Sequence, residues 1–336
     1  MRCRNAYVAL LMFLIVPSVF GQNPVSVPDI PGVVAARTKY VLIKEGMKSS
    51  EGTIAARDGS LYFTEPSENR IYRVDAKDHV TVLFDAGKVD DPAGERWRVT
   101  ALAMDRQGRI FATRRANKSV GIAIVYPPAE AKFVAEAYQG KPFSAPNDLT
   151  MAKDGGIYFT EPGAPQTRDH SVYYVKPPGE IILATGKLRR PNGIVLSRDE
   201  KLLYVADSDD ENLFVFDVKP GGTVENRRNF AHLAGIVRTD KGMNNGVDGL
   251  AIDNKDRVYC ISNAGIEVFS PEGKALGIIP VPVKLKTLHS LAKTERHSIS
   301  SATAPSINSA CWLRDIKDDP NNSRADVARA GCNCDE

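Results

Sequence analysis

The sequence has few cysteines and lacks the short motifs of several common enzyme classes. It contains five Cys among 336 residues, and their spacing predicts no disulfide framework. It has no G-x-S-x-G nucleophile elbow, no H-E-x-x-H zinc motif, no phosphate-binding loop and no C-x-x-C pair. These absences argue against a disulfide-stapled domain, a serine hydrolase of the elbow type, a zincin and a P-loop nucleotide enzyme.

The chain also lacks a strong charge of either sign. Its formal net charge is +3, and only the segment Arg96 to Lys118 is locally basic. Nucleic-acid-binding domains concentrate basic residues on one face. We therefore expect no nucleic-acid partner, and we interpret Arg96 to Lys118 as a solvated face.

Only the N-terminus carries a long apolar run. Arg2 and Arg4 precede the run from Ala6 to Phe20, and small Gly21 stands before Gln22. This pattern predicts a signal peptide over residues 1–21. The run is shorter than the roughly 20 residues that span a bilayer. We therefore expect a secreted or periplasmic protein with no membrane association after cleavage, beginning with a linker over residues 22–38.

Five segments repeat one pattern of an apolar strand, a polar turn and an apolar strand with an aromatic residue. The aromatic residue follows the leading residue by 11 positions in the first, second, third and fifth segments and by 12 in the fourth. Successive segments begin 49, 47, 45 and 56 residues apart. The segments are EGTIAARDGSLYFTE, TALAMDRQGRIFAT, NDLTMAKDGGIYFTE, NGIVLSRDEKLLYVAD and DGLAIDNKDRVYCIS.

This spacing predicts an all-β fold, because period-two alternation rich in Val, Ile, Tyr and Phe indicates strands. Repeats of roughly 40 to 50 residues are typical of four-stranded β-propeller blades. The domain is expected over residues 39–286. Five visible repeats leave room for a sixth blade, which would combine C-terminal strands with an N-terminal strand near Lys39 to Lys44, so we expect six blades with the last one incomplete.

The leading residues of the repeats are expected to point at one mouth of the central channel. They are Glu51, Thr100, Asn147, Asn192 and Asp248. Asn-Gly and Asp-Gly are also ordinary turn dipeptides. Turn formation, however, does not explain why four repeats carry a side chain with a carboxylate or amide oxygen at the same position. Carboxylate and amide oxygens without His or Cys suit Ca²⁺, Mg²⁺ or Mn²⁺ better than a soft-ligand zinc site.

Other polar residues near the same mouth are expected to be structural. Thr100 is interpreted as a strand residue. Glu65 and Glu161 recur in the FTEP segments, where we favour loop-facing polar contacts to the neighbouring blade over a role in the channel. Asp207 and Asn245 could line the pocket, but both lie in turn-rich stretches and are expected to be structural.

The motifs Glu51-Gly52, Pro146-Asn147-Asp148, Pro191-Asn192-Gly193 and Asp248-Gly249 resemble those of the senescence-marker-protein/gluconolactonase/luciferin-regenerating-enzyme-like family, including its secreted bacterial gluconolactonases. The resemblance covers about Tyr40 to Val283. It implies that Glu51, Asn192 and Asp248 bind a divalent metal and that Asn147 contacts substrate. The animal members hold substrate with an Arg two residues before that Asn, where this chain has Ala145.

The resemblance implies a metal-dependent lactone hydrolase that opens a small-molecule sugar lactone to the hydroxy acid, and this is the function we predict. One cation is expected, Ca²⁺ first, with Mg²⁺, Mn²⁺ and Zn²⁺ as alternatives. It would polarise the carbonyl and activate a water. Asp248 would act as the general base and Asn147 would orient substrate hydroxyls. The alternatives are a propeller that binds glycans or proteins without catalysis, and a propeller lyase or synthase.

The repeat pattern stops near Lys286, and residues 287–336 form an aberrant tail. The stretch from Thr287 to Trp312 is Ser-rich and lacks the aromatic strand of a sixth blade. With permissible codons, a shifted frame over it encodes a polar turn followed by LYIV and VYQF strands, so we interpret the tail as a frameshift within the last blade. The alternative is a divergent disordered tail.

Overall fold

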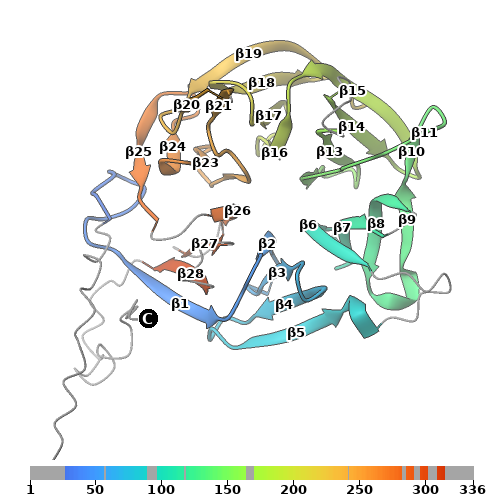
Figure 1. Cartoon of the computed structure of the whole chain (residues 1–336), viewed down its shortest axis with the longest axis horizontal. Helices are drawn as coiled ribbons and strands as arrows, with labels where there is room; N and C mark the ends of the chain where they lie inside the picture. Colours follow the sequence, from blue (N-terminus) through green and yellow to red (C-terminus); the bar gives the residue numbers. More distant parts are fainter. Residues whose placement is uncertain are drawn as a thin grey trace, which may run out of the picture.

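The structure is a computed structural model that describes residues 27–56, 58–88, 97–116, 119–163, 170–240, 242–281, 285–290, 296–301 and 309–314. Within these ranges it consists of strands, turns and two short 3-10 helices, η1 (Ala86–Lys88) and η2 (Pro128–Glu130). Figure 1 shows the sheets arranged in a ring about one axis. The prediction of an all-β propeller is therefore confirmed.

Five four-stranded antiparallel sheets follow one another along the chain, and each contains one of the sequence repeats. Blade 1 is β2 (Glu51–Ala55), β3 (Leu61–Glu65), β4 (Arg70–Val74) and β5 (Val80–Asp85). Blade 2 is β6 (Arg98–Met104), β7 (Ile110–Arg115), β8 (Val120–Tyr126) and β9 (Lys132–Ala135). Blade 3 is β12 (Leu149–Met151), β13 (Ile157–Glu161), β14 (His170–Lys176) and β15 (Glu180–Leu188).

The last two of these sheets have the same strand order. Blade 4 is β16 (Pro191–Leu196), β17 (Leu202–Asp207), β18 (Asn212–Val218) and β19 (Val224–His232). Blade 5 is β22 (Leu250–Ile252), β23 (Val258–Ser262), β24 (Gly265–Phe269) and β25 (Ala275–Ile279). In every blade the first strand of the repeat is the innermost one, which places the leading residues close to the axis.

A further four-stranded sheet joins the two ends of the described chain. Its order is β1 (Lys39–Glu45), β28 (Ser309–Arg314), β27 (Arg296–Ser301) and β26 (Leu285–Ser290). That the last blade is incomplete and that an aberrant tail begins at residue 287 stay predictions. Pairing satisfies backbone N–H and C=O groups whatever the side chains, so an open edge at β1 favours strands there. Residues 315–336 of the predicted tail lie outside the described residues.

The innermost strands contact one another in the order β2, β6, β12, β16, β22 and β26, and β26 returns to β2. Figure 1 shows β2, β6, β16 and β26 nearest the axis. The core lies between consecutive blades. Ile54 and Phe84 of blade 1, for example, pack against Leu102 and Ala123 of blade 2, and similar clusters join the later blades.

The segment before β1 packs on blade 5 instead of forming a free linker. Val27 and Ile30 are buried against Tyr259 and Val268. Arg257 also donates a hydrogen bond to the carbonyl of Gly32. The predicted signal peptide, residues 1–21, lies outside the described residues. Among the described residues, no helix is long and apolar enough to cross a membrane.

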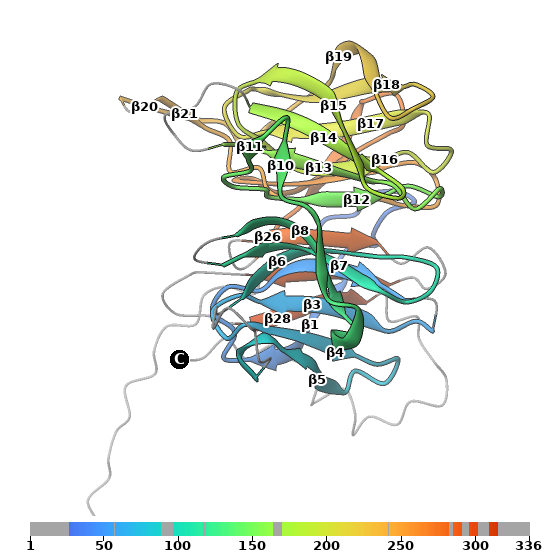
Figure 2. The same ribbon diagram turned by 90° about the vertical axis from the view of Figure 1, so that its right-hand side faces the viewer.

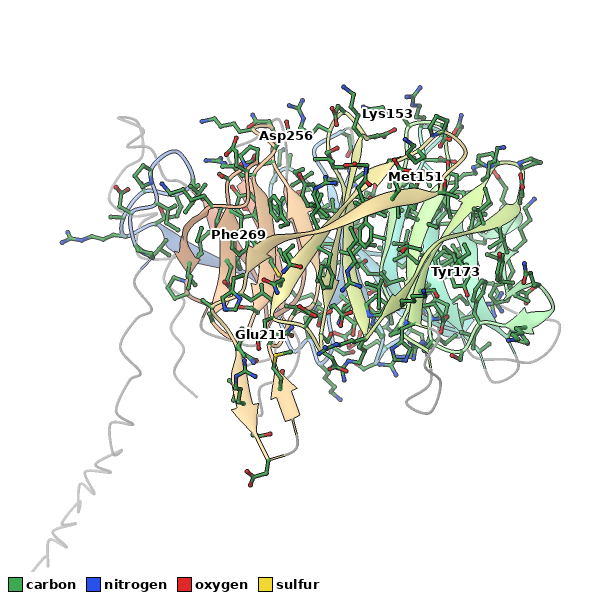
Figure 3. The ribbon with its side chains drawn as sticks, turned by 90° about the horizontal axis from the view of Figure 1, so that it is seen from above. Met151, Lys153, Tyr173, Glu211, Asp256 and Phe269 are labelled. Atoms are coloured by element: carbon green, nitrogen blue, oxygen red, sulfur yellow. The ribbon has the colours of Figure 1, made fainter. Side chains whose placement is uncertain are left out.

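The blades have two distinct faces. The inner strands begin at one end of the ring, here called the mouth face, where the second strand of each blade also ends. The turns between first and second strands lie at the opposite end. Figure 3 shows this separation, with Lys153 and Asp256 at one face and Glu211 at the other.

Two short hairpins extend the connections at the mouth face. They are β10–β11 (Ala137–Tyr138 with Lys141–Pro142) and β20–β21 (Val237–Thr239 with Gly242–Asn244). The β20–β21 hairpin projects beyond the blades in both side views (Figures 2 and 3).

Candidate functional site

The four predicted site residues lie at the starts of four inner strands on the mouth face. Glu51 begins β2, Asn192 lies in β16, and Asn147 and Asp248 directly precede β12 and β22. All four are half-buried. Backbone hydrogen bonds fix the positions of two of them along the ring axis. The amides of Asn147 and Asp248 donate to the carbonyls of Thr160 and Ile261 in the neighbouring strands, at 2.9 and 3.3 Å.

Glycine follows Glu51 and Asn192 because the next blade passes very close to the backbone there. A Cβ at Gly52 would overlap the carbonyl of Thr100, and a Cβ at Gly193 would overlap the carbonyl of Asp248. Gly52 also has a positive φ of 58°, which favours glycine. The X-Gly motifs are therefore inter-blade contacts, and the second one brings Asn192 beside Asp248.

The side chain of Asn192 is oriented by its amide nitrogen. Nδ2 donates to the carbonyl of Val247 at 3.2 Å and to Oγ of Ser208 at 3.4 Å. Its Oδ1 is buried and has no hydrogen-bond partner among the described residues. A buried unpaired acceptor costs free energy unless a ligand completes it. This oxygen therefore fits a cation, and the donor set of two carboxylates and amide oxygens fits a hard divalent ion.

Within the described residues, no three His, Cys, Asp or Glu side chains come together as a metal site. The predicted set mixes carboxylates with amides, so it does not depend on such a cluster. Asn192 and Asp248 are brought together by the contacts above. That the oxygens of Glu51, Asn192 and Asp248 share one cation stays a prediction.

Asp148, next to Asn147, is a site residue that we did not single out from the sequence. Its Oδ1 accepts from the amide of Leu149 at 2.8 Å and its Oδ2 from the amide of Ile194 at 3.3 Å, which ties blade 3 to blade 4. Desolvation raises the pKa of its carboxyl to about 7, and the charge of Glu51 acts in the same direction. Glu51 and Asp148 are thus electrostatically coupled across the mouth.

The Thr of the FTE segments connects successive blades. Thr64 Oγ1 donates to the carbonyl of Thr100 at 2.8 Å, and Thr160 Oγ1 donates to the carbonyl of Asn192 at 2.7 Å. The hydroxyl of Thr100 itself bonds to Thr113, which supports the prediction that it is a strand residue.

The recurring acidic residues hold the loops that precede the site. Glu65 accepts from the amides of Lys48 and Ser49, and Glu161 accepts from the amide of Ala145 at 2.9 Å. Asp207 accepts from the amides of Arg189 and Arg190 at 2.7 and 2.9 Å. Asn245 is buried and donates to the carbonyls of Asp207 and Asp210. Their hydrogen bonds confirm the structural roles expected for these four residues.

The basic segment is a solvated face only in part, since Arg98 and Arg106 are exposed as expected whereas Arg114 and Arg115 are not. Arg114 is only 7% exposed, and its guanidinium stacks on Trp97 at 3.5 Å and on Phe133 at 4.4 Å. Arg115 is half-buried, and its Nη2 donates to the carbonyl of Pro146 at 3.3 Å. The aromatic rings stabilise the buried guanidinium of Arg114, and the carbonyl of Pro146 stabilises that of Arg115.

The fold and the site define a β-propeller with acidic and amide side chains at one mouth of its ring. Residues 49–302 match the SMP-30/gluconolactonase/LRE-like region. The chain therefore belongs to the SMP-30/gluconolactonase/LRE-like family, as its motifs predicted. The match extends past residue 287, where the predicted tail begins.

Two curated relatives illustrate the range of this similarity. A gluconolactonase of Zymomonas mobilis is 27% identical over 277 residues, covering 75% of each chain. A diisopropyl-fluorophosphatase of Loligo vulgaris is 25% identical over 275 residues, covering 73% of this chain and 81% of the relative.

Solved structures show the same fold. A gluconolactonase from Xanthomonas campestris superposes with a TM-score of 0.66 at 22% identity, covering 82% of this chain and 89% of that one. The calcium-binding protein regucalcin from Agrobacterium tumefaciens gives a TM-score of 0.65 at 16% identity, covering 82% and 93%.

Proposed function

We propose that this protein is a lactone hydrolase that works with one divalent cation and opens a sugar lactone to the corresponding hydroxy acid. The observation that carries the proposal is the buried, unpartnered Oδ1 of Asn192, held beside Asp248 by the hydrogen bond from its own amide to Val247. The family and the relatives named gluconolactonase support a hydrolase that acts on ester bonds.

Glu51, Asn192 and Asp248 would hold the cation, with Ca²⁺ as the expected ion. The calcium-binding family neighbour supports this choice, as does a donor set made only of oxygens. When bound, the ion supplies Lewis-acid polarisation of the ester carbonyl.

The remaining steps belong to the side chains of this chain. Asp248 accepts the proton of the attacking water, since a general base must lie within hydrogen-bond reach of the nucleophile. Asn147, at the start of β12, orients the substrate through its side-chain amide. Asp148 fixes the spacing of β12 and β16 through the amide of Ile194, so Asn147 and Asn192 keep a constant separation.

The proposal includes a six-bladed ring, in which the sheet of β1, β28, β27 and β26 is the sixth blade. The contact of β26 with both β22 and β2 supports ring closure. It also includes export from the cytoplasm through the predicted signal peptide, residues 1–21, because a charged start followed by an apolar run is typical of secreted proteins.

A lactone panel with and without chelator tests the proposed function. We expect turnover of at least one sugar lactone, loss of turnover in chelator, and recovery when Ca²⁺ is restored. Turnover that is indifferent to chelator contradicts the cation. Absence of turnover on every lactone, with retained binding of a glycan or protein, favours the propeller that binds without catalysis.

A further inference from the structure

Two charged side chains at the junction of blades 2 and 3 each leave one buried atom unused. Nε of Arg115, at the end of β7, and Oε2 of Glu161, at the end of β13, are buried without a hydrogen-bond partner in the part of the chain that the structure describes. Both strands end at the mouth face. A buried unpaired donor and a buried unpaired acceptor at one junction are costly in a folded protein.

The equivalent acids of the other blades show that loop support does not require this arrangement. In blade 1, Glu65 uses both oxygens, with Oε1 accepting from Ser49 Oγ at 2.7 Å and Oε2 from the amide of Lys48 at 3.0 Å. In blade 4, Asp207 also uses both oxygens, for the amides of Arg189 and Arg190. Glu161 supports its loop with Oε1 alone, which accepts from Ser144 Oγ and the amides of Ala145 and Gly163.

The guanidinium of Arg115 lies next to the predicted substrate residue. Its Nη2 donates to the carbonyl of Pro146, directly before Asn147. Arg114 is directed elsewhere, since it stacks on Trp97. Among the described residues, no carboxylate forms an ion pair with Arg115, although Glu161 and Glu51 act on it electrostatically.

The pKa values of Arg115 and Glu161 are both shifted by burial, as expected for charged groups held away from water. Burial lowers the pKa of the Arg115 guanidinium, the nearby Arg98 adds to this effect, and Glu161 and Glu51 oppose it. Burial raises the pKa of the Glu161 carboxyl, and the hydrogen bonds to its loop partly offset the rise. Both groups would gain from a polar ligand that bonds to them away from water.

We propose that Arg115 and Glu161 form a specificity-determining pair that recognises a hydroxyl group of the substrate. A hydroxyl can accept from Nε of Arg115 and donate to Oε2 of Glu161 in one contact, because it carries both a donor hydrogen and acceptor lone pairs. An unsubstituted ring methylene satisfies neither atom. The inference rests on the proposed lactone hydrolysis and assigns the selection of hydroxylated lactones to residues beside Asn147.

The test compares two lactones with the same six-membered ring, gluconolactone with hydroxyl groups and δ-valerolactone without them. The quantity measured is the ratio of kcat/KM for the two substrates. Glu161→Gln keeps an acceptor oxygen for Ser144 and Ala145 while replacing Oε2 with a donor. Arg115→Lys keeps the positive charge and removes Nε. Arg109→Lys, directly before the opposite end of β7, is the matched control.

We expect Glu161→Gln and Arg115→Lys each to lower the ratio at least about tenfold, mainly through a higher KM for gluconolactone, because a site built to bond a hydroxyl discriminates by leaving its own groups unpaired. Arg109→Lys should leave the ratio at the wild-type value. A purely structural role, including a trapped water between the two atoms, lowers turnover of both lactones equally, and that outcome overturns the proposal.

A separate measurement distinguishes failure of this inference from failure of the proposed function. If the wild-type protein hydrolyses neither of these lactones nor any other lactone of the panel, the proposed hydrolysis fails. The pair of Arg115 and Glu161 is then tested by calorimetric titration with gluconate. Binding that weakens about tenfold in both variants supports the hydroxyl subsite. Gluconate binding that is unchanged in the variants, or absent in the wild type, overturns it.

Discussion

Replacing Asp148 with Asn should change how the stability of the protein depends on pH. Desolvation raises the pKa of this carboxyl to about 7 in the folded protein, against 3.8 in its ordinary state. The folded state therefore holds the proton more tightly than the unfolded chain does. The stability that the group contributes is complete below about pH 4 and is lost as the pH rises through about 7.

The size of the effect follows from the shift of about three pKa units. One unit corresponds to about 1.4 kcal/mol, so the full contribution is about 4 kcal/mol, and about 3 kcal/mol of it is lost between pH 5 and pH 8. Asn does not titrate and keeps one acceptor for the amide of Leu149 or Ile194. Asp148→Asn resembles the protonated carboxyl, so it should be closest to the wild type in stability at pH 5 and should become the more stable protein, by about 3 kcal/mol, at pH 8.

Urea unfolding of both proteins at pH 5, 6, 7 and 8, in chelator and followed by circular dichroism, measures this difference. We expect the free energy of unfolding of the wild type, relative to that of the variant, to fall by about 3 kcal/mol from pH 5 to pH 8. Parallel profiles, with a constant difference at every pH, would refute the assignment of a titrating carboxyl to Asp148. Asp199→Asn, at an exposed turn on the opposite face, provides the control for a general effect of charge removal.

Three further predictions concern the site, the blade contacts and the tail. Asp248→Asn should lower kcat/KM at least about a hundredfold, whereas Asn147→Ala should mainly raise KM. Steady-state kinetics measure both variants, and equally mild effects would contradict the two roles. Gly193→Ala should destabilise the protein by about 1–3 kcal/mol in urea unfolding because its Cβ would overlap the carbonyl of Asp248, whereas Gly186→Ala in β15, with only Ser171 Oγ at 3.4 Å, should cost less. Restoring the shifted reading frame after Lys286 should raise the melting temperature and the soluble yield, and resequencing that finds an intact frame with no blade pattern in the shifted one would dismiss the frameshift.

The sequence predicted the parts of the fold that depend on local patterns. Alternating apolar residues and a fixed register to Tyr62, Phe111 and Tyr158 were sufficient to predict the strands of five blades and to place the leading residue of each repeat at an inner strand. Whether the segments after Lys286 form a complete sixth blade stays a prediction, because backbone pairing with β1 does not depend on the aromatic pattern of the repeats.

The missed site residues depend on contacts between blades. Asp148 belongs to the motif Pro146-Asn147-Asp148, yet its role depends on the amide of Ile194 in the next blade. Arg115 was expected to be solvated like its basic neighbours. The groups that withdraw it from this role, the carbonyl of Pro146 and the carboxylate of Glu161, are distant from it in sequence. Inter-blade geometry of this kind cannot be read from one repeat at a time.

Calorimetric titration of the metal-free protein with Ca²⁺ tests the central claim most directly. The account predicts one site per chain in the wild type and binding weakened at least about a hundredfold in Asn192→Ala, which removes the unpartnered Oδ1. Asn226→Ala, on the outer strand β19, should bind as the wild type does. No Ca²⁺ binding to the wild type, or equal binding by Asn192→Ala, would contradict a cation held by Glu51, Asn192 and Asp248.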